Sequence, residues 1–255
     1  MQNRFGGRVA IVTGAAHGIG RALALAFAEL GASVIVCDIL VEELRETVRL
    51  ATAKGWACQA CPLDVSNHSA VVAMANETLA TVGRIDILVN NAGGVLGQTG
   101  QPLESVSEAD WRAILAVNLD GVFYCSQAVA PAMKAARYGR IVNISSGAGL
   151  GVSLTGIQAY ASAKAGQIGL TRQLAHELGP WGITVNCVAP GFVRSNPTTE
   201  KQWESYGAEG QRRLVESIAM RRLGTPADIV HGVLHFASED AGWTTGQTLA
   251  IDGGR

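Results

Sequence analysis

Residues 9–20 read VAIVTGAAHGIG, an apolar run followed by a glycine-rich turn and the start of a helical pattern. Glycines at such a strand-to-helix turn let the backbone approach a pyrophosphate at the N-terminus of the helix. Gly14, Gly18 and Gly20 are spaced G-x-x-x-G-x-G instead of the ordinary G-x-G-x-x-G, and glycine-rich turns also serve packing. The stretch predicts a phosphate-binding loop, which needs support from other positions.

Short β-branched runs alternate with helical patterns along the whole chain. The runs are almost continuously apolar, which is typical of parallel strands buried on both faces. The prediction is an α/β protein that forms a single domain over residues 1–255: a doubly wound, seven-stranded parallel sheet with helices on both faces. Strands are expected at 9–13, 33–38, 58–63, 85–90, 140–145, 183–188 and 248–251, and helices at 20–30, 41–53, 69–82, 107–117, 121–137, 158–178 and 226–237.

The composition narrows the function classes. With 48% hydrophobic and 16% charged residues, the 255-residue chain can bury a large core, which excludes a disordered protein. The net charge of -1, without a basic cluster, argues against nucleic acid or an anionic membrane as a partner. Five cysteines, no apolar run near ~18 residues and no signal-like start predict reduced thiols in a cytoplasmic protein.

An acidic residue stands at the end of the second expected strand. Asp38 follows Gly20 by 18 residues, where a carboxylate can accept hydrogen bonds from an adenosine ribose and would repel a 2′-phosphate. An NADP site normally offers Arg or Lys nearby, whereas this chain offers His17, which is mostly neutral at pH 7, and Ile39. NAD is therefore the expected cofactor, in preference to NADP.

Tyr160 and Lys164 are spaced i, i+4 on an expected helix, so both lie on one face. A free tyrosine, with a pKa of ~10, is a poor base at neutral pH, and a neighbouring cation favours its phenolate. The pair predicts a proton-transfer site, with an exposed helix pair as the alternative.

Four motifs, in this order, resemble those of the classical short-chain dehydrogenase/reductase family over essentially the whole chain. They are the loop at 13–20, Asn90-Asn91-Ala92-Gly93, Ser145-Ser146, and Tyr160 with Lys164. The resemblance implies that residues 1–255 form a single NAD(P)-binding Rossmann-type catalytic domain. It also implies an NAD(P)(H)-dependent oxidoreductase that interconverts a secondary alcohol and a ketone by hydride transfer, without a metal.

The resemblance also implies a role for each matched residue. Tyr160 is the general acid/base, Lys164 tunes it and binds the nicotinamide ribose, and Asn118 supports a proton relay through water. Ser146 hydrogen-bonds the substrate oxygen, although its distance from Tyr160 is one residue longer than usual and leaves Ser145 as an alternative. The implied cofactor contacts are Gly14, His17, Gly18, Ile19, Gly20, Asp38, Asp64, Val65, Asn91, Ala92, Gly93, Tyr160, Lys164, Pro190, Gly191, Val193 and Ser195.

Substrate recognition is expected in residues 191–222, a polar stretch interpreted as an irregular lid. The family's layout brings small, apolar and amide groups near the reacting carbon and no carboxylate clamp, which favours a polyol, sugar or cyclic hydroxy substrate. The alternative is a 3-oxoacyl-thioester reductase of the acyl-carrier-protein type. A non-catalytic NAD-sensing protein is the alternative from another class, although all catalytic residues are present. The residues placed near the substrate are Gly94, Gly147, Leu154, Gln158 and Phe192.

Two other patterns are interpreted as structural. Cys58 and Cys61 form a C-x-x-C in an expected strand, where residues three apart point to opposite faces and cannot share a metal. His231 and His235 are spaced i, i+4, but Gly232 stands where H-E-x-x-H needs glutamate. The segment 252–255 resembles one that the family uses for subunit contact, which implies a homotetramer.

Overall fold

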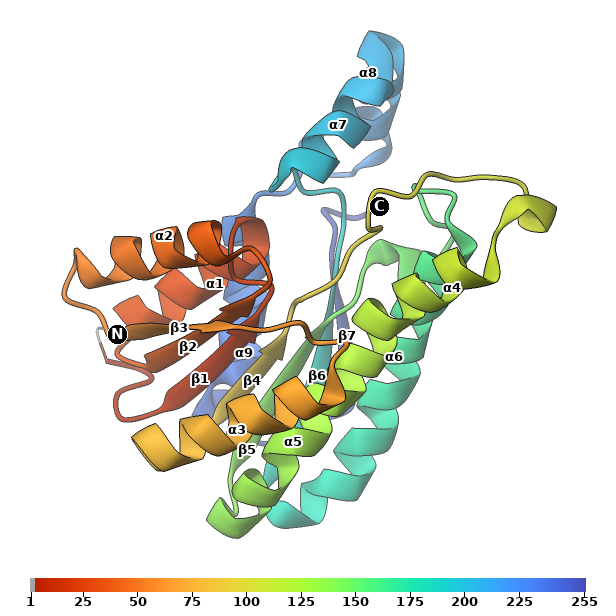
Figure 1. The fold of residues 1–255 in the computed structure, drawn as a ribbon. Coiled ribbons are helices and arrows are strands. Elements are labelled where there is room, and N and C mark those ends of the chain that lie inside the picture. Colours follow the sequence, from red (N-terminus) through yellow and green to blue (C-terminus); the bar gives the residue numbers. More distant parts are fainter. Residues whose placement is uncertain (1–2) are drawn as a thin grey trace.

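A parallel sheet of seven strands, in the order β3-β2-β1-β4-β5-β6-β7, forms the centre of residues 3–255, which the computed structural model describes (Figure 1). Every expected strand is present, and its ends lie within two residues of the predicted ones. The strands are β1 (Val9–Thr13), β2 (Ser33–Asp38), β3 (Cys58–Pro62), β4 (Ile87–Asn90), β5 (Gly139–Ile144), β6 (Ile183–Pro190) and β7 (Thr248–Ile251).

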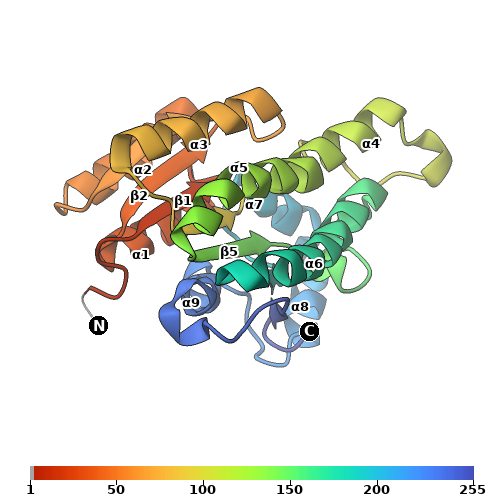
Figure 2. The ribbon, with the colours of Figure 1, turned by 90° about the horizontal axis from the view of Figure 1, so that it is seen from below.

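Helices cover both faces of the sheet, as Figure 2 shows. One face packs against α1 (Gly18–Glu29), α2 (Val41–Thr52) and α9 (Pro226–Ala237). The other packs against α3 (His68–Val82), α5 (Gly121–Ala136) and α6 (Gln158–Leu178). The predicted doubly wound α/β fold is therefore confirmed.

The alternation of side chains along β1 shows how the two apolar layers arise. Ala10 and Val12 belong to the core on the α1 and α9 side, whereas Val9 and Ile11 belong to the core on the α3 and α5 side. Complete burial of a valine or isoleucine side chain stabilises the fold by about 1.5–3 kcal/mol. Because both faces are buried, residues 9–12 have no solvent-facing position, which explains their continuous apolar run.

The helices expected at 107–117 and 121–137 are both present and follow each other without a break in the helical backbone. Helix α4 (Glu108–Leu115) leads into the π-helical turn η2 (Ala116–Asp120) and then into α5. Residues 108–136 are long and apolar enough to cross a membrane by length and composition alone. In this fold α5 turns that apolar surface to the sheet, where Val129 and Met133 are completely buried.

The expectation of an irregular lid at 191–222 was wrong. Two helices occupy most of this segment, α7 (Pro197–Ser205) and α8 (Gly207–Ser217), and they project from the body of the molecule in Figure 1. Asn196 caps α7 through a reciprocal capping box with Thr199, and Pro197 occupies the first turn. These residues are ordinary helix-start signals, but the polar composition of the segment masked them.

Short 3₁₀ turns lie between the longer elements: η1 (Leu103–Ser105), η3 (Gly147–Gly149), η4 (Gly179–Trp181) and η5 (Glu239–Ala241).

Candidate active site

A cleft of about 470 Å³ opens at the carboxyl ends of the strands. Its centre lies where β1 and β4 are neighbours, because the chain builds β2 and β3 outward on one side of β1 and the remaining strands on the other. Ligands of open α/β sheets bind at such a reversal of strand order. Every residue predicted to contact the cofactor lines this cleft.

The glycine loop fits a pyrophosphate by its backbone. Gly14 and Gly18 have φ angles of +65° and +58°, which other residues rarely adopt. Helix α1 begins at Gly18, and His17 at its N-cap makes no side-chain hydrogen bond to the first turn. The first-turn amides of a 12-residue helix therefore remain available to an anion, which the helix dipole also favours.

Asn91 holds the end of β4 against this loop. Its side-chain amide donates to the carbonyl oxygens of Thr13 and Gly14, both at 3.0 Å. The Thr13 hydroxyl accepts in return from the amides of Asn91 and Ala92. Asn91 was expected near the cofactor ribose, and it does border the cleft, but its amide is committed to positioning the glycine loop.

The carboxylate of Asp38 is oriented by the backbone at the end of β2. It accepts hydrogen bonds from the amide of Ala16 at 3.0 Å and from that of Leu40 at 3.1 Å. Among the described residues that line the cleft, the lysines and arginines are Lys164 and Arg255. The Asp38 carboxylate therefore borders the cleft in a fixed orientation.

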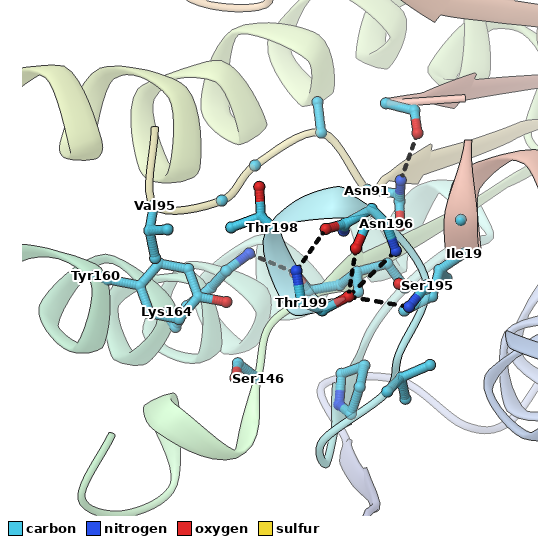
Figure 3. A pocket seen from close by; sticks show the side chains of 18 of the residues that line it. Ile19, Asn91, Val95, Ser146, Tyr160, Lys164, Ser195, Asn196, Thr198 and Thr199 are labelled. Carbon is cyan, nitrogen blue, oxygen red and sulfur yellow. Dashed lines mark hydrogen bonds between the residues drawn. The ribbon is translucent and has the colours of Figure 1, made fainter. Parts of the chain in front are cut away.

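Tyr160, Lys164 and Ser146 meet at the other end of the cleft (Figure 3). The Lys164 ammonium donates to the carbonyl oxygen of Ile144 at 2.8 Å and lies 5.7 Å from the centre of the Tyr160 ring. Burial lowers the pKa of Lys164 to about 8. Burial also raises the pKa of Tyr160, and the neighbouring Ser146 only partly opposes this shift.

The sequence predicted that Lys164 would lower the pKa of Tyr160, whereas in this arrangement the pKa of Tyr160 is raised. The ammonium points at the Ile144 carbonyl and not at the phenol, so desolvation dominates the Tyr160 pKa. An i, i+4 spacing placed both residues on one face but could not reveal how deeply the fold buries them.

The two adjacent serines have different surroundings. The Ser145 hydroxyl is buried and donates to the Lys164 carbonyl oxygen at 2.7 Å, which ties β5 to α6. The Ser146 hydroxyl accepts from the amide of Ala148 at 3.2 Å, and its presence lowers the pKa of Tyr160. Of the two, Ser146 is thus the residue placed beside the proton-transfer group.

Asn118 is the one predicted catalytic residue that does not line the cleft. It lies in the π-helical turn η2, fully buried, where its amide donates to the carbonyl oxygens of Gly94 and Ile114 at 2.9 Å. Its Oδ1 accepts from the Gly94 amide, and its main-chain carbonyl accepts from the side chain of Gln167. Here Asn118 positions the loop after β4. The prediction of a water relay stays a prediction.

Comparison with known proteins gives close relatives over nearly the full length. The chain is 45% identical over 248 residues to the (2S)-[(R)-hydroxy(phenyl)methyl]succinyl-CoA dehydrogenase subunit BbsD of Thauera aromatica, covering 97% of this chain and 96% of that protein. It is 39% identical to the 3-oxoacyl-[acyl-carrier-protein] reductase FabG of Thermotoga maritima, with 98% of both chains covered. A Beutenbergia cavernae structure with bound NADP is 35% identical, with a TM-score of 0.90 over 99% of this chain and 98% of that one.

A protein-family model described as enoyl-(acyl carrier protein) reductase matches residues 14–255. The chain belongs to the short-chain dehydrogenase/reductase family. It is therefore an NAD(P)-dependent oxidoreductase. The family that the order of the four motifs predicted is confirmed.

The structure of this short-chain dehydrogenase also shows lining residues that sequence reasoning missed. Arg255 borders the cleft, because Gly253 and Gly254 are hydrogen-bonded to the segment after α8. The 252–255 segment was expected to serve subunit contact alone. Gln158, expected beside the substrate, donates instead to the carbonyl of Gln101 and does not line the cleft. Other lining residues that it missed include Val95, Leu96, Gly97, Val117, Val152, Ser153 and Thr155. Asn196, Thr198, Thr199 and Gln202 also line the cleft and lie in the 191–222 stretch that was expected to recognise the substrate.

Proposed function

We propose that this protein is an NAD-preferring enzyme that interconverts a secondary alcohol and a ketone, with Tyr160 as general acid/base. One observation carries the proposal: Tyr160, Ser146 and Lys164 stand at one end of the same cleft whose other end is formed by the glycine loop and Asp38. A cofactor bound along this cleft brings its reactive ring to the proton-transfer group.

The residues divide the chemistry between them. A bound nicotinamide accepts or supplies the hydride at the substrate carbon. During alcohol oxidation the Tyr160 oxygen takes the proton of the substrate hydroxyl, and during ketone reduction it returns that proton. Ser146 donates a hydrogen bond to the substrate oxygen, which holds it beside Tyr160. Lys164 is the residue expected to bind the nicotinamide ribose, and its ammonium is held in the cleft by the carbonyl oxygen of Ile144.

The cleft favours an apolar acyl thioester as the substrate over the polyol, sugar or cyclic hydroxy class expected from the sequence. Leu96, Val152 and Leu154 line it with half or more of Leu96 and Val152 exposed, and such exposed apolar groups mark binding surfaces. Arg255 adds a cation that can meet the phosphates of a thioester carrier. The proteins of T. aromatica and T. maritima, named for a CoA thioester and an acyl-carrier-protein substrate, support this choice.

The cofactor preference is the first prediction. We expect kcat/KM with NAD to exceed that with NADP, and Asp38→Ala to lower kcat/KM for NAD roughly 10–100-fold, because hydrogen bonds to a charged group contribute about 1.5–3 kcal/mol. Absorbance of the reduced nicotinamide measures both, over a panel of acyl thioesters, sugars, polyols and cyclic alcohols. Asp110→Ala is the matched control, since its carboxylate is hydrogen-bonded to Ser107 and does not line the cleft.

Each outcome of that panel has a meaning. Thioester turnover with NAD supports the whole proposal, and turnover of polyols alone returns the substrate class to the one expected from the sequence. A preference for NADP in the unaltered protein contradicts the role given to Asp38. Tight NAD binding without any turnover points to the non-catalytic sensor.

The assembly is the second prediction. We propose a cytoplasmic homotetramer that acts on a small molecule, with neither nucleic acid nor a membrane as a partner. Strand β7 is a sheet edge with Leu249 partly exposed, the adjacent Trp243 is fully exposed, and all five cysteines are free thiols. Light scattering after gel filtration is expected to give about 106 kDa, four times the 26.6 kDa chain. A stable species at the chain mass contradicts this prediction.

A further inference from the structure

Two cysteines that are distant in sequence face each other across strands β2 and β3. Cys37 and Cys61 are direct partners in the parallel register of these strands. Both side chains point to the face of the sheet that packs against α3 and α5, where Cys37 is fully buried and Cys61 is partly buried. Because β3 is the edge strand, Cys61 is the more accessible member of the pair.

The neighbouring Cys58 provides a natural contrast. It lies on the same strand but belongs to the core on the opposite face, beside α1 and α2. The expectation that Cys58 and Cys61 point in opposite directions is therefore confirmed. The cross-strand neighbour of Cys61 is Cys37, which the C-x-x-C spacing could not reveal.

The geometry of the pair lies close to that of a disulfide. Adjacent strands are about 4.7–4.9 Å apart, within the Cα separation of about 4.4–6.8 Å that a disulfide spans. The neighbouring Cys61 raises the pKa of Cys37, and Cys37 in turn lowers the pKa of Cys61. The accessible thiol is thus also the one that more readily becomes a thiolate, the form that reacts with oxidants.

The pair is mechanically connected to the candidate cofactor site. The carbonyl oxygen of Cys37 accepts a hydrogen bond from the amide of Ala15 in the glycine loop at 3.1 Å. The next residue, Asp38, accepts from the amide of Ala16. A disulfide between Cys37 and Cys61 would hold their Cβ atoms about 3.5–4.5 Å apart, and any shift of Cys37 that this requires acts directly on these two contacts.

We propose that Cys37 and Cys61 form a peroxide-oxidisable dithiol whose disulfide distorts the end of β2 and weakens NAD binding. The Cys61 sulfur attacks hydrogen peroxide; an S–O bond forms, the O–O bond breaks, and one water leaves. The Cys37 sulfur then attacks the Cys61 sulfenic acid; the S–S bond forms, the S–O bond breaks, and a second water leaves. Two thiols lose two electrons in total, and one peroxide becomes two waters.

The experiment uses the full-length protein carrying Cys58→Ser, because residues 55–84 form one tryptic peptide that contains both Cys58 and Cys61. The protein is treated with hydrogen peroxide, its remaining thiols are alkylated, and it is digested without reduction. The expected product is peptide 22–45, which contains Cys37, linked to peptide 55–84. KM for NAD is expected to rise about threefold or more on oxidation and to recover with dithiothreitol.

Cys61→Ser, added to the same background, is expected to give no linked peptide and no change in KM on treatment. Cys61→Ala replaces it if the thermal unfolding midpoint shows that the serine variant is not folded. Overoxidation of Cys61 without a link, or a link from Cys37 to Cys125, overturns the dithiol. A link with unchanged KM overturns its effect on the cofactor site.

The effect on NAD rests on the proposed function, whereas the formation of the disulfide does not. If the protein turns over with NADP alone, or not at all, peptide mapping still decides whether the dithiol forms. The failure of one proposal is thereby distinguishable from the failure of the other.

Discussion

Replacing Tyr160 with phenylalanine is expected to lower kcat for alcohol oxidation by about 10²–10⁴-fold, the usual contribution of a positioned general acid/base. The phenol oxygen is the group beside Ser146 that can exchange a proton with the substrate oxygen. The Kd for NAD is expected to stay within about threefold, because the substitution leaves the glycine loop and Asp38 intact. Steady-state kinetics and a fluorescence titration with NAD measure the two quantities.

Tyr124→Phe is the matched control for this substitution. Tyr124 lies on α5, where its ring packs against His68 and Phe123, away from the cleft. Its loss of a hydroxyl group is expected to leave kcat unchanged. If Tyr160→Phe kept more than about a tenth of the original kcat, another group would have to move the proton.

The architecture was predictable because its determinants are local. The apolar run at 9–13 and its counterparts are long enough and rich enough in β-branched residues to indicate buried strands without knowledge of their neighbours. The glycine loop and Asp38 are also local, since each follows directly from the end of a strand. Their convergence on one cleft then follows from the parallel order of the sheet.

The parts that sequence reasoning missed depend on packing between distant segments. Whether Arg255 reaches the cleft depends on how 252–255 is held against the segment after α8. The pKa of Tyr160 depends on burial, which an i, i+4 spacing does not contain. The role of Asn118 depends on a π-helical turn that carries its side chain toward Gly94 instead of into the cleft. The helix α7 is a different case, because its capping residues were present in the sequence and were outweighed by composition.

Gly20→Ala is expected to impair both stability and cofactor binding. A Cβ atom at position 20 would overlap the carbonyl oxygen of Gly14 and lie 2.6 Å from the side-chain nitrogen of Asn91. The obstacle on one side is backbone, so the glycine loop itself must move. Overpacking of this kind costs about 1–3 kcal/mol in the free energy of unfolding. The moved loop no longer offers its amides to a pyrophosphate, so KM for NAD is expected to rise about tenfold or more.

Gly169→Ala is the matched control for this substitution. It makes the same chemical change at a position where the added methyl group is expected to raise the free energy of unfolding instead of lowering it. Gly169 lies in the middle of α6, is exposed, and has no atom within 4 Å of the added Cβ. An alanine there is expected to stabilise the protein by about 0.5–1 kcal/mol, because glycine is the poorer helix former, and to leave KM for NAD unchanged. Urea unfolding and NAD kinetics on both variants test the pair together. Equal changes in stability would mean that helix propensity and not the Gly14 contact governs position 20, and an unchanged KM in Gly20→Ala would remove the glycine loop from its proposed role.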